Sequence, residues 1–110
     1  MMSARIPARL GAAMLLVAVL CAPANAVPEP TDTIVVKDFL FQPMLLAIKA
    51  GTTVTWSNRD EEPHTISATG LFRSGALDTN QSFSFRFDKP GTFHFTCSIH
   101  PQMTGTILVQ

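Results

Sequence analysis

The chain has 110 residues, and 8 lysine and arginine side chains balance 8 aspartate and glutamate side chains. This length is that of one domain, which excludes a multidomain enzyme. The even balance describes the whole chain, and it changes if an export segment is removed from the amino terminus.

The first 26 residues have the organisation of a secretory signal peptide. Two arginines form a short basic start, residues 10–20 are apolar, and an Ala-Asn-Ala sequence ends at Ala26, where signal peptidases cleave such a pattern. The apolar run is too short to span a bilayer. Cys21 follows a leucine and not a small residue, so we favour ordinary cleavage over a lipid anchor. We predict a signal peptide over residues 1–26 and a soluble protein exported to the periplasm, without a membrane span after cleavage.

The predicted mature domain covers residues 27–110, and it keeps six basic and eight acidic side chains, a formal charge of −2. No basic patch remains, which argues against nucleic acid as a partner. Cys97 is the one cysteine in this range, so an internal disulfide is excluded. We expect a monomer.

Alternation with a period of two residues is typical of strands and runs through the mature chain. In chain order, the predicted strands cover residues 34–37, 45–48, 53–57, 65–67, 82–87, 92–96 and 104–109. Val54 and Trp56 alternate with polar residues, as do Phe83, Phe85 and Phe87, and we expect these large side chains to share one core. No stretch has helical periodicity.

Several short strands with closely spaced turns predict an all-β fold, namely a two-sheet antiparallel β-sandwich filled from both inner faces. The turns include Ala50-Gly51 and the segment 58–63, in which we interpret the acidic run 60–62 as a solvated turn. Domains of this size commonly depend on a disulfide, a metal or a partner subunit.

The chemistry of the chain is concentrated in residues 93–103, with the sequence FHFTCSIHPQM. If the two phenylalanines of this segment face the core, alternation turns Cys97 inward and His94 toward solvent. Cys97 is therefore a candidate ligand, and His94 is not.

His100 and Met103 follow Cys97 at intervals of three residues. This spacing lets one tight loop turn the three side chains toward a common point, and Pro101 stiffens the loop. A fourth side chain can come from His64, 33 residues before Cys97, if its loop lies at the same end of the sandwich.

A thiolate, two imidazoles and a thioether favour one copper ion that changes between Cu(I) and Cu(II). Zinc also accepts cysteine and histidine, but it gains little from methionine. Taken alone, each of these residues has an ordinary role as core filler or as a turn residue. Their spacing around the sole mature cysteine favours a joint site, and two histidines and a cysteine with a weak axial methionine describe a blue copper centre.

The chain resembles the cupredoxins, the type 1 blue copper proteins that include plastocyanin, pseudoazurin and amicyanin. The resemblance rests on the segments GTTVTWSN at 51–58, PHT at 63–65, GTFHFTCSIHPQM at 91–103 and GTILV at 105–109. The short Cys-x-x-His-x-x-Met spacing is similar to that of amicyanin. Thr65 stands where these proteins commonly have an asparagine that ties the ligand loops together, and its hydroxyl is a candidate substitute.

The resemblance implies a cupredoxin-like Greek-key sandwich with copper near one end. It implies the metal ligands His64, Cys97, His100 and Met103. His100 would be the partly exposed ligand near which redox partner proteins dock, framed by Pro101, Gln102, and Met44 or Pro63. We expect Thr65, Asn58 and Ser98 to orient the ligands through hydrogen bonds.

These features predict a small exported electron carrier that shuttles single electrons between partners and is not an enzyme. The alternative is an envelope protein that binds or delivers copper without a dedicated electron-transfer partner. A thiol nucleophile built from Cys97 and a histidine is disfavoured, because it leaves Met103 without a role.

Overall fold

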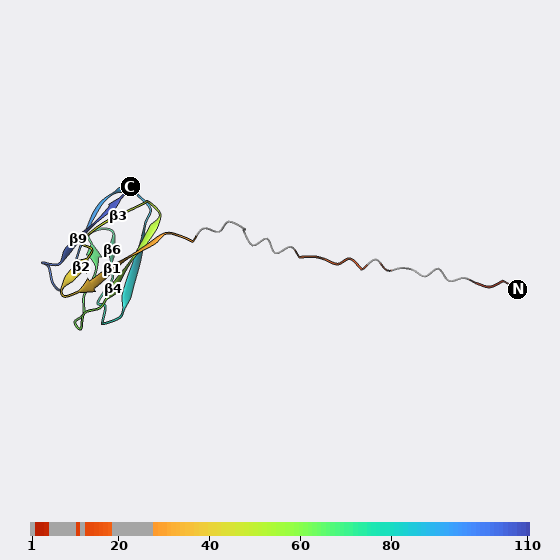
Figure 1. Ribbon diagram of the computed structural model, residues 1–110, viewed down its shortest axis with the longest axis horizontal. Helices are drawn as coiled ribbons and strands as arrows, with labels where there is room; N and C mark the ends of the chain where they lie inside the picture. The colour runs from red at the N-terminus through yellow and green to blue at the C-terminus, as the bar shows by residue number, and fades with distance from the viewer. Residues whose placement is uncertain (1, 5–10, 12, 19–27) are drawn as a thin grey trace.

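The computed structural model describes residues 2–4, 11, 13–18 and 28–110 (Figure 1). The predicted signal peptide and its cleavage point lie mostly outside these residues and stay a prediction. Within the described ranges the regular elements are all strands, and none of these residues forms a helix with the length and apolar character needed to cross a membrane.

Strands occupy most of the predicted mature domain, which confirms the all-β prediction. The described residues form the strands β1 (Thr31–Lys37), β2 (Leu40–Gln42), β3 (Leu45–Ile48), β4 (Thr52–Asn58), β5 (Ser67–Ala68), β6 (Phe72–Arg73), β7 (Ser82–Phe87), β8 (Gly91–Thr96) and β9 (Thr104–Val109). The predicted strands overlap β1, β3, β4, β5, β7, β8 and β9, although the predicted strand 65–67 shares only Ser67 with β5, and β2 and β6 were not predicted. Each of these two is only two or three residues long, so a period of two residues is barely expressed.

The strands form two sheets, ordered β2-β1-β4-β7 and β3-β9-β8-β5-β6. The two-sheet sandwich is confirmed, but the expected antiparallel pairing is wrong at two pairs, because β1 pairs with β4 and β3 pairs with β9 in parallel. The chain leaves the first sheet after β2, adds β3 to the second sheet and returns to β4 beside β1. This crossover through the opposite sheet lets neighbouring strands run in the same direction.

The core lies between the sheets and is centred on Trp56, which is fully buried. Its indole ring packs against the Phe95 ring at a centroid distance of 5.4 Å and an angle of 76°. The expected inward phenylalanines of β7 also contribute, with Phe87 buried and the other two packed against the core. Gly105 lies directly under the Phe95 ring, so that a Cβ atom there would overlap the ring.

Two loops meet at the end of the sandwich where β4 and β8 finish. Pairing of Ser67 with Thr96 brings the start of β5 beside the end of β8. His64 is fixed further by an isolated bridge to Leu77, in which each backbone amide donates to the carbonyl of the other residue at 3.1 and 2.7 Å. The fold therefore places His64 next to Cys97.

Candidate metal centre

The loop that follows β8 turns tightly and is closed by its own backbone. The amide of Cys97 donates to the carbonyl of Met103 at 3.1 Å, and the amide of Met103 donates to the carbonyl of His100 at 2.9 Å. Cys97 is fully buried and Met103 is 3% exposed. The loop thus turns Cys97 and Met103 inward, as the sequence predicted.

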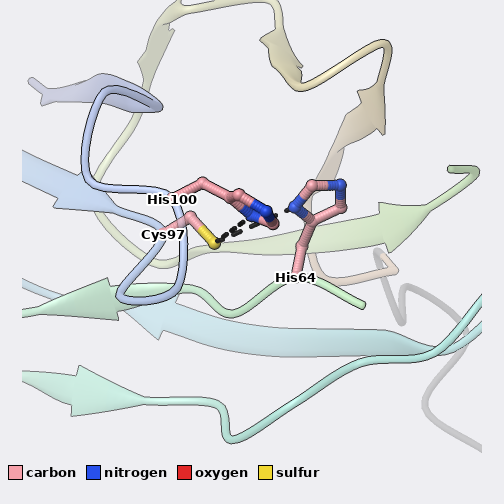
Figure 2. A group of neighbouring side chains, drawn as sticks. All are labelled: His64, Cys97 and His100. Carbon is pink, nitrogen blue, oxygen red and sulfur yellow. Dashed lines mark hydrogen bonds between the residues drawn. The ribbon is translucent and has the colours of Figure 1, made fainter. Parts of the chain in front are cut away.

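Three of the four predicted ligands come together in a cluster, which we call the donor cluster: His64, Cys97 and His100 (Figure 2). The Nδ1 atoms of His64 and His100 lie 3.9 and 3.7 Å from the Cys97 sulfur. One donor atom from each residue lies within 4.8 Å of the other two. Met103 belongs to the same closed loop, and its ligation stays a prediction.

Burial is unequal across the donor cluster. His64 and Cys97 are fully buried, whereas the side chain of His100 is 21% exposed. The Nε2 atom of His100 lies 3.9 Å from the exposed Glu62 carboxylate. His94 points to solvent, with its Nδ1 atom 3.1 Å from the Thr106 hydroxyl, which agrees with its exclusion as a ligand. His100 is therefore the member of the cluster that reaches the surface.

The sulfur of Cys97 accepts hydrogen bonds from the neighbouring loop. The Thr65 amide donates to Sγ at 3.3 Å, and the Thr65 hydroxyl lies 3.7 Å from it. Burial raises the pKa of the Cys97 thiol. Hydrogen bonds to the sulfur outweigh this effect and hold the pKa below its usual value; they come from the Thr65 amide, the His100 ring, the Ile99 amide and the Thr65 hydroxyl. The thiolate, which is the form that binds metals, is therefore favoured.

Thr65 also ties the two loops to each other, as the sequence analysis expected. Its hydroxyl oxygen accepts a hydrogen bond from the Ser98 amide at 2.8 Å and lies 2.8 Å from the Ser98 hydroxyl. Threonine thereby links the segment after His64 to the segment after Cys97. This hydrogen bonding serves the linking purpose that the resemblance assigned to asparagine.

The outer nitrogen of His64 is held by Asp60, whose Oδ2 atom lies 2.8 Å from Nε2. An ionised carboxylate can only accept, so Nε2 carries the hydrogen, and in a neutral ring this leaves the lone pair of Nδ1 free toward Cys97. Burial raises the pKa of Asp60, but hydrogen bonds from the Phe39 and Asp38 amides and from His64 hold the pKa below its usual range. Asp60 is therefore ionised at neutral pH.

Interpreting the acidic run 60–62 as a solvated turn is wrong for Asp60, which is 5% exposed, although Glu61 and Glu62 are exposed. The reason lies in Asn58, whose Oδ1 accepts the Asp60 amide at 2.9 Å and turns that residue inward. The Asn58 Nδ2 group donates to the carbonyls of Glu62 and Leu77, both at 2.9 Å. Asn58 therefore orients His64 through the loop and not by direct contact.

Phe39 is a site residue that sequence reasoning missed, because it lies in the turn after the first predicted strand. Its ring stands edge-on to the His64 ring, with centroids 5.3 Å apart, and to the His100 ring, with centroids 5.1 Å apart. Phe39 is 41% exposed, so it lies between the two imidazoles and solvent. No periodic pattern marks this position.

The donor set can be tested for its fit to one metal ion. Nitrogen and sulfur bonded to a common ion at about 2.1 and about 2.3 Å can be at most about 4.4 Å apart. The two nitrogen to sulfur distances of 3.9 and 3.7 Å satisfy this limit. A thiolate and two imidazoles, with a buried thioether in the same loop, fit copper better than zinc or a hard cation.

Comparison with known proteins supports the same interpretation. A family profile described as a cupredoxin-like domain matches residues 10–109. Amicyanin-alpha of Methylorubrum extorquens is 32% identical over 93 residues, which cover 76% of this chain and 75% of that protein. Plastocyanin of Scenedesmus fuscus is 36% identical over 85 residues, which cover 64% of this chain and 87% of that protein.

Solved structures extend the likeness to the fold. The Cu(I) form of an amicyanin variant superposes with a TM-score of 0.71 at 26% identity, covering 77% of this chain and 87% of that one. A purple cupredoxin from Nitrosopumilus maritimus superposes with a TM-score of 0.68 at 31% identity, covering 71% of this chain and 98% of that one. The family profile, which matches residues 10–109, includes the sandwich and both loops of the donor cluster, and the chain belongs to the cupredoxin-like family.

Proposed function

We propose that this protein is a small exported blue copper protein that carries single electrons between redox partner proteins. The observation that carries the proposal is the meeting of a buried cysteine sulfur and two imidazoles from loops 33 residues apart. The likeness to amicyanin, one variant of which is described in its Cu(I) form, supports copper as the ion. Cleavage after Ala26, a periplasmic location and a monomeric state belong to the proposal.

The residues that would hold the ion are His64, Cys97, His100 and Met103. Bound copper would supply a one-electron change between Cu(II) and Cu(I). The chain itself keeps the donors in place. Thr65 fastens the two loops, Asp60 sets the His64 ring, and the backbone closes the Cys97 loop. Donors held in this way need to move little when the charge of the site changes.

Electron exchange with a partner would take place near His100, the exposed member of the donor cluster. Exposed apolar side chains lie beside it in the chain and in space, since Ile99 is 50% exposed and Phe39 is 41% exposed. Docking framed by Met44 or Pro63 stays a prediction. Both residues are exposed.

A carrier is better supported than an enzyme. Cys97 is fully buried, so its sulfur cannot be reached by a substrate without displacement of the surrounding loops. This burial also argues against a thiol nucleophile, which needs an accessible thiolate.

The test is to express the full chain with export in a bacterial host and to measure the mass of the recovered protein. Cu(II) should then produce an intense thiolate-to-copper absorption band, a narrow-hyperfine EPR signal and a reversible one-electron wave. Cys97→Ser should abolish the band, whereas His94→Ala, which removes an exposed histidine outside the donor cluster, should keep it. Absence of the band in the unaltered protein would contradict the proposal, and rapid copper transfer to an apo acceptor without reversible electron exchange would favour copper delivery.

A further inference from the structure

The Asp60 carboxylate connects a predicted metal ligand to a distant hairpin. Its Oδ1 atom accepts the Asp38 amide at 2.7 Å, while Oδ2 accepts the Phe39 amide at 3.0 Å and faces Nε2 of His64 at 2.8 Å. The Asp60 side chain is only 8% exposed. One buried carboxylate thus receives three donors, two of them from a turn 21 and 22 residues earlier in the chain.

The hairpin that binds this carboxylate has an unfavourable backbone conformation. Asp38 and Phe39 form the two-residue turn between β1 and β2, with φ angles of 53° and 57°. Glycine or asparagine normally occupies such turns, because a side chain at positive φ meets the backbone. Two successive amides in a tight turn can form a concave site for an anion, and the Asp60 carboxylate occupies it.

This turn places the Phe39 ring over the donor cluster. The ring stands at 87° to the His64 ring and at 88° to the His100 ring, so its edge faces both imidazoles. In Figure 2 the two imidazoles lie next to each other, and a dashed line joins each of them to the Cys97 sulfur. The contact with both rings makes Phe39 a cap on the solvent side of the donor cluster.

We propose that Asp60 is a positioning residue that fixes the His64 ring with Nδ1 toward Cys97 and, through the same carboxylate, holds Phe39 as a cap over both imidazoles. The second part rests on the proposed copper function, because the cap would limit the approach of water and small solutes to the ion. The first part concerns the chain alone. Asp60 thereby couples the orientation of the His64 ring to the access of water and small solutes to the ion.

The first test needs no metal. In apo protein labelled with ¹⁵N at histidine, NMR should show His64 with hydrogen on Nε2 in the unaltered chain. Asp60→Ala should remove this preference, whereas Glu61→Ala, which removes a neighbouring exposed carboxylate of the same charge, should preserve it. Phe39→Gly should also preserve it. An unchanged His64 tautomer in Asp60→Ala would overturn the positioning role.

The second test measures access to the ion as the rate at which EDTA removes copper. Asp60→Ala and Phe39→Gly should each accelerate removal by about 10–100-fold, the range in which residues behind metal ligands act, while Glu61→Ala should change it less than about twofold. Glycine tolerates positive φ, so Phe39→Gly removes the cap without straining the turn. An unchanged rate in Phe39→Gly would overturn the cap.

A substitute variant and the blue band of the unaltered protein keep the outcomes distinct. If Asp60→Ala does not fold, Asp60→Asn replaces it, because an amide offers one acceptor oxygen to three donors and must lose part of the contact. A proposed function that fails would appear as an unaltered protein without a blue band. The His64 tautomer in the apo protein would still decide whether Asp60 positions the ring.

Discussion

The two loops of the donor cluster are built in different ways. The loop carrying Cys97, His100 and Met103 is closed by hydrogen bonds within seven residues, so its shape is local. The loop carrying His64 depends on remote contacts, including a bridge to Leu77. A local loop can be recognised from residue spacing, whereas a loop held by remote contacts is defined only by the folded chain.

Copper should stabilise the protein by joining the two loops. At a free concentration one thousand times Kd, binding to the native state alone raises the free energy of unfolding by about 4 kcal/mol. Denaturant unfolding with and without copper under anaerobic conditions measures this gain. Cys97→Ser should show little gain in the free energy of unfolding with copper, and an equal gain in that variant would mean that copper binds elsewhere.

Asn58→Ala should damage the His64 loop most among single substitutions. It removes the partner of the Asp60 amide and of the Glu62 and Leu77 carbonyls, all at 2.9 Å. The Asp60 and Leu77 groups are bonded to Asn58 in buried positions, and leaving them without partners should lower the free energy of unfolding of apo protein by about 3 kcal/mol. Gln42→Ala removes an exposed amide and should cost less than about 0.5 kcal/mol. Equal costs in the two variants would contradict the buried role of Asn58.

Gly105→Ala should disturb the region beneath the Cys97 loop. A Cβ atom at this position overlaps the Phe95 ring, which packs on Trp56. Overpacking of this kind should cost about 2 kcal/mol in the free energy of unfolding. Phe95→Leu in the same chain should recover part of the loss, and a double-mutant cycle measures the coupling. Strict additivity of the two substitutions would show that the overlap is relieved elsewhere.

Thr65→Val should loosen the link between the loops with the smallest effect. The substitution keeps the shape of the side chain and the hydrogen bond from the backbone amide to the Cys97 sulfur. It removes the hydroxyl that accepts a hydrogen bond from the Ser98 amide. We expect a loss of about 1 kcal/mol in the unfolding of apo protein. Thr65→Ser keeps the hydroxyl and should lie between Thr65→Val and the unaltered protein. A Val variant as stable as the Ser variant would show that the hydroxyl does not hold the loops.

Much of the fold was predictable because its strands alternate over four or more residues. The very short β2 and β6 were not, and only Ser67 of the two-residue β5 was. The two parallel pairings were also missed, because they depend on how the chain crosses between sheets. In the site, the spacing after β8 pointed to Cys97, His100 and Met103. The position of His64 needed the fold to bring two loops together.

Asp60 and Phe39 show where sequence reasoning reaches its limit. An acidic run normally lies in solvent, and only the capping of the Asp60 amide by Asn58 reveals that this carboxylate turns inward. The turn at Phe39 depends on that carboxylate, 21 residues away. Neither residue stands out in the sequence, and the role of each depends on its contact with the other.

The central indole has a practical consequence for studying the protein. Trp56 is the one tryptophan of the chain, it is fully buried, and its Nε1 atom has no hydrogen-bond partner among the described residues. An indole in such apolar surroundings fluoresces at short wavelength and shifts to the red when water reaches it. The molecule therefore contains its own optical probe of sandwich opening, and no dye needs to be attached.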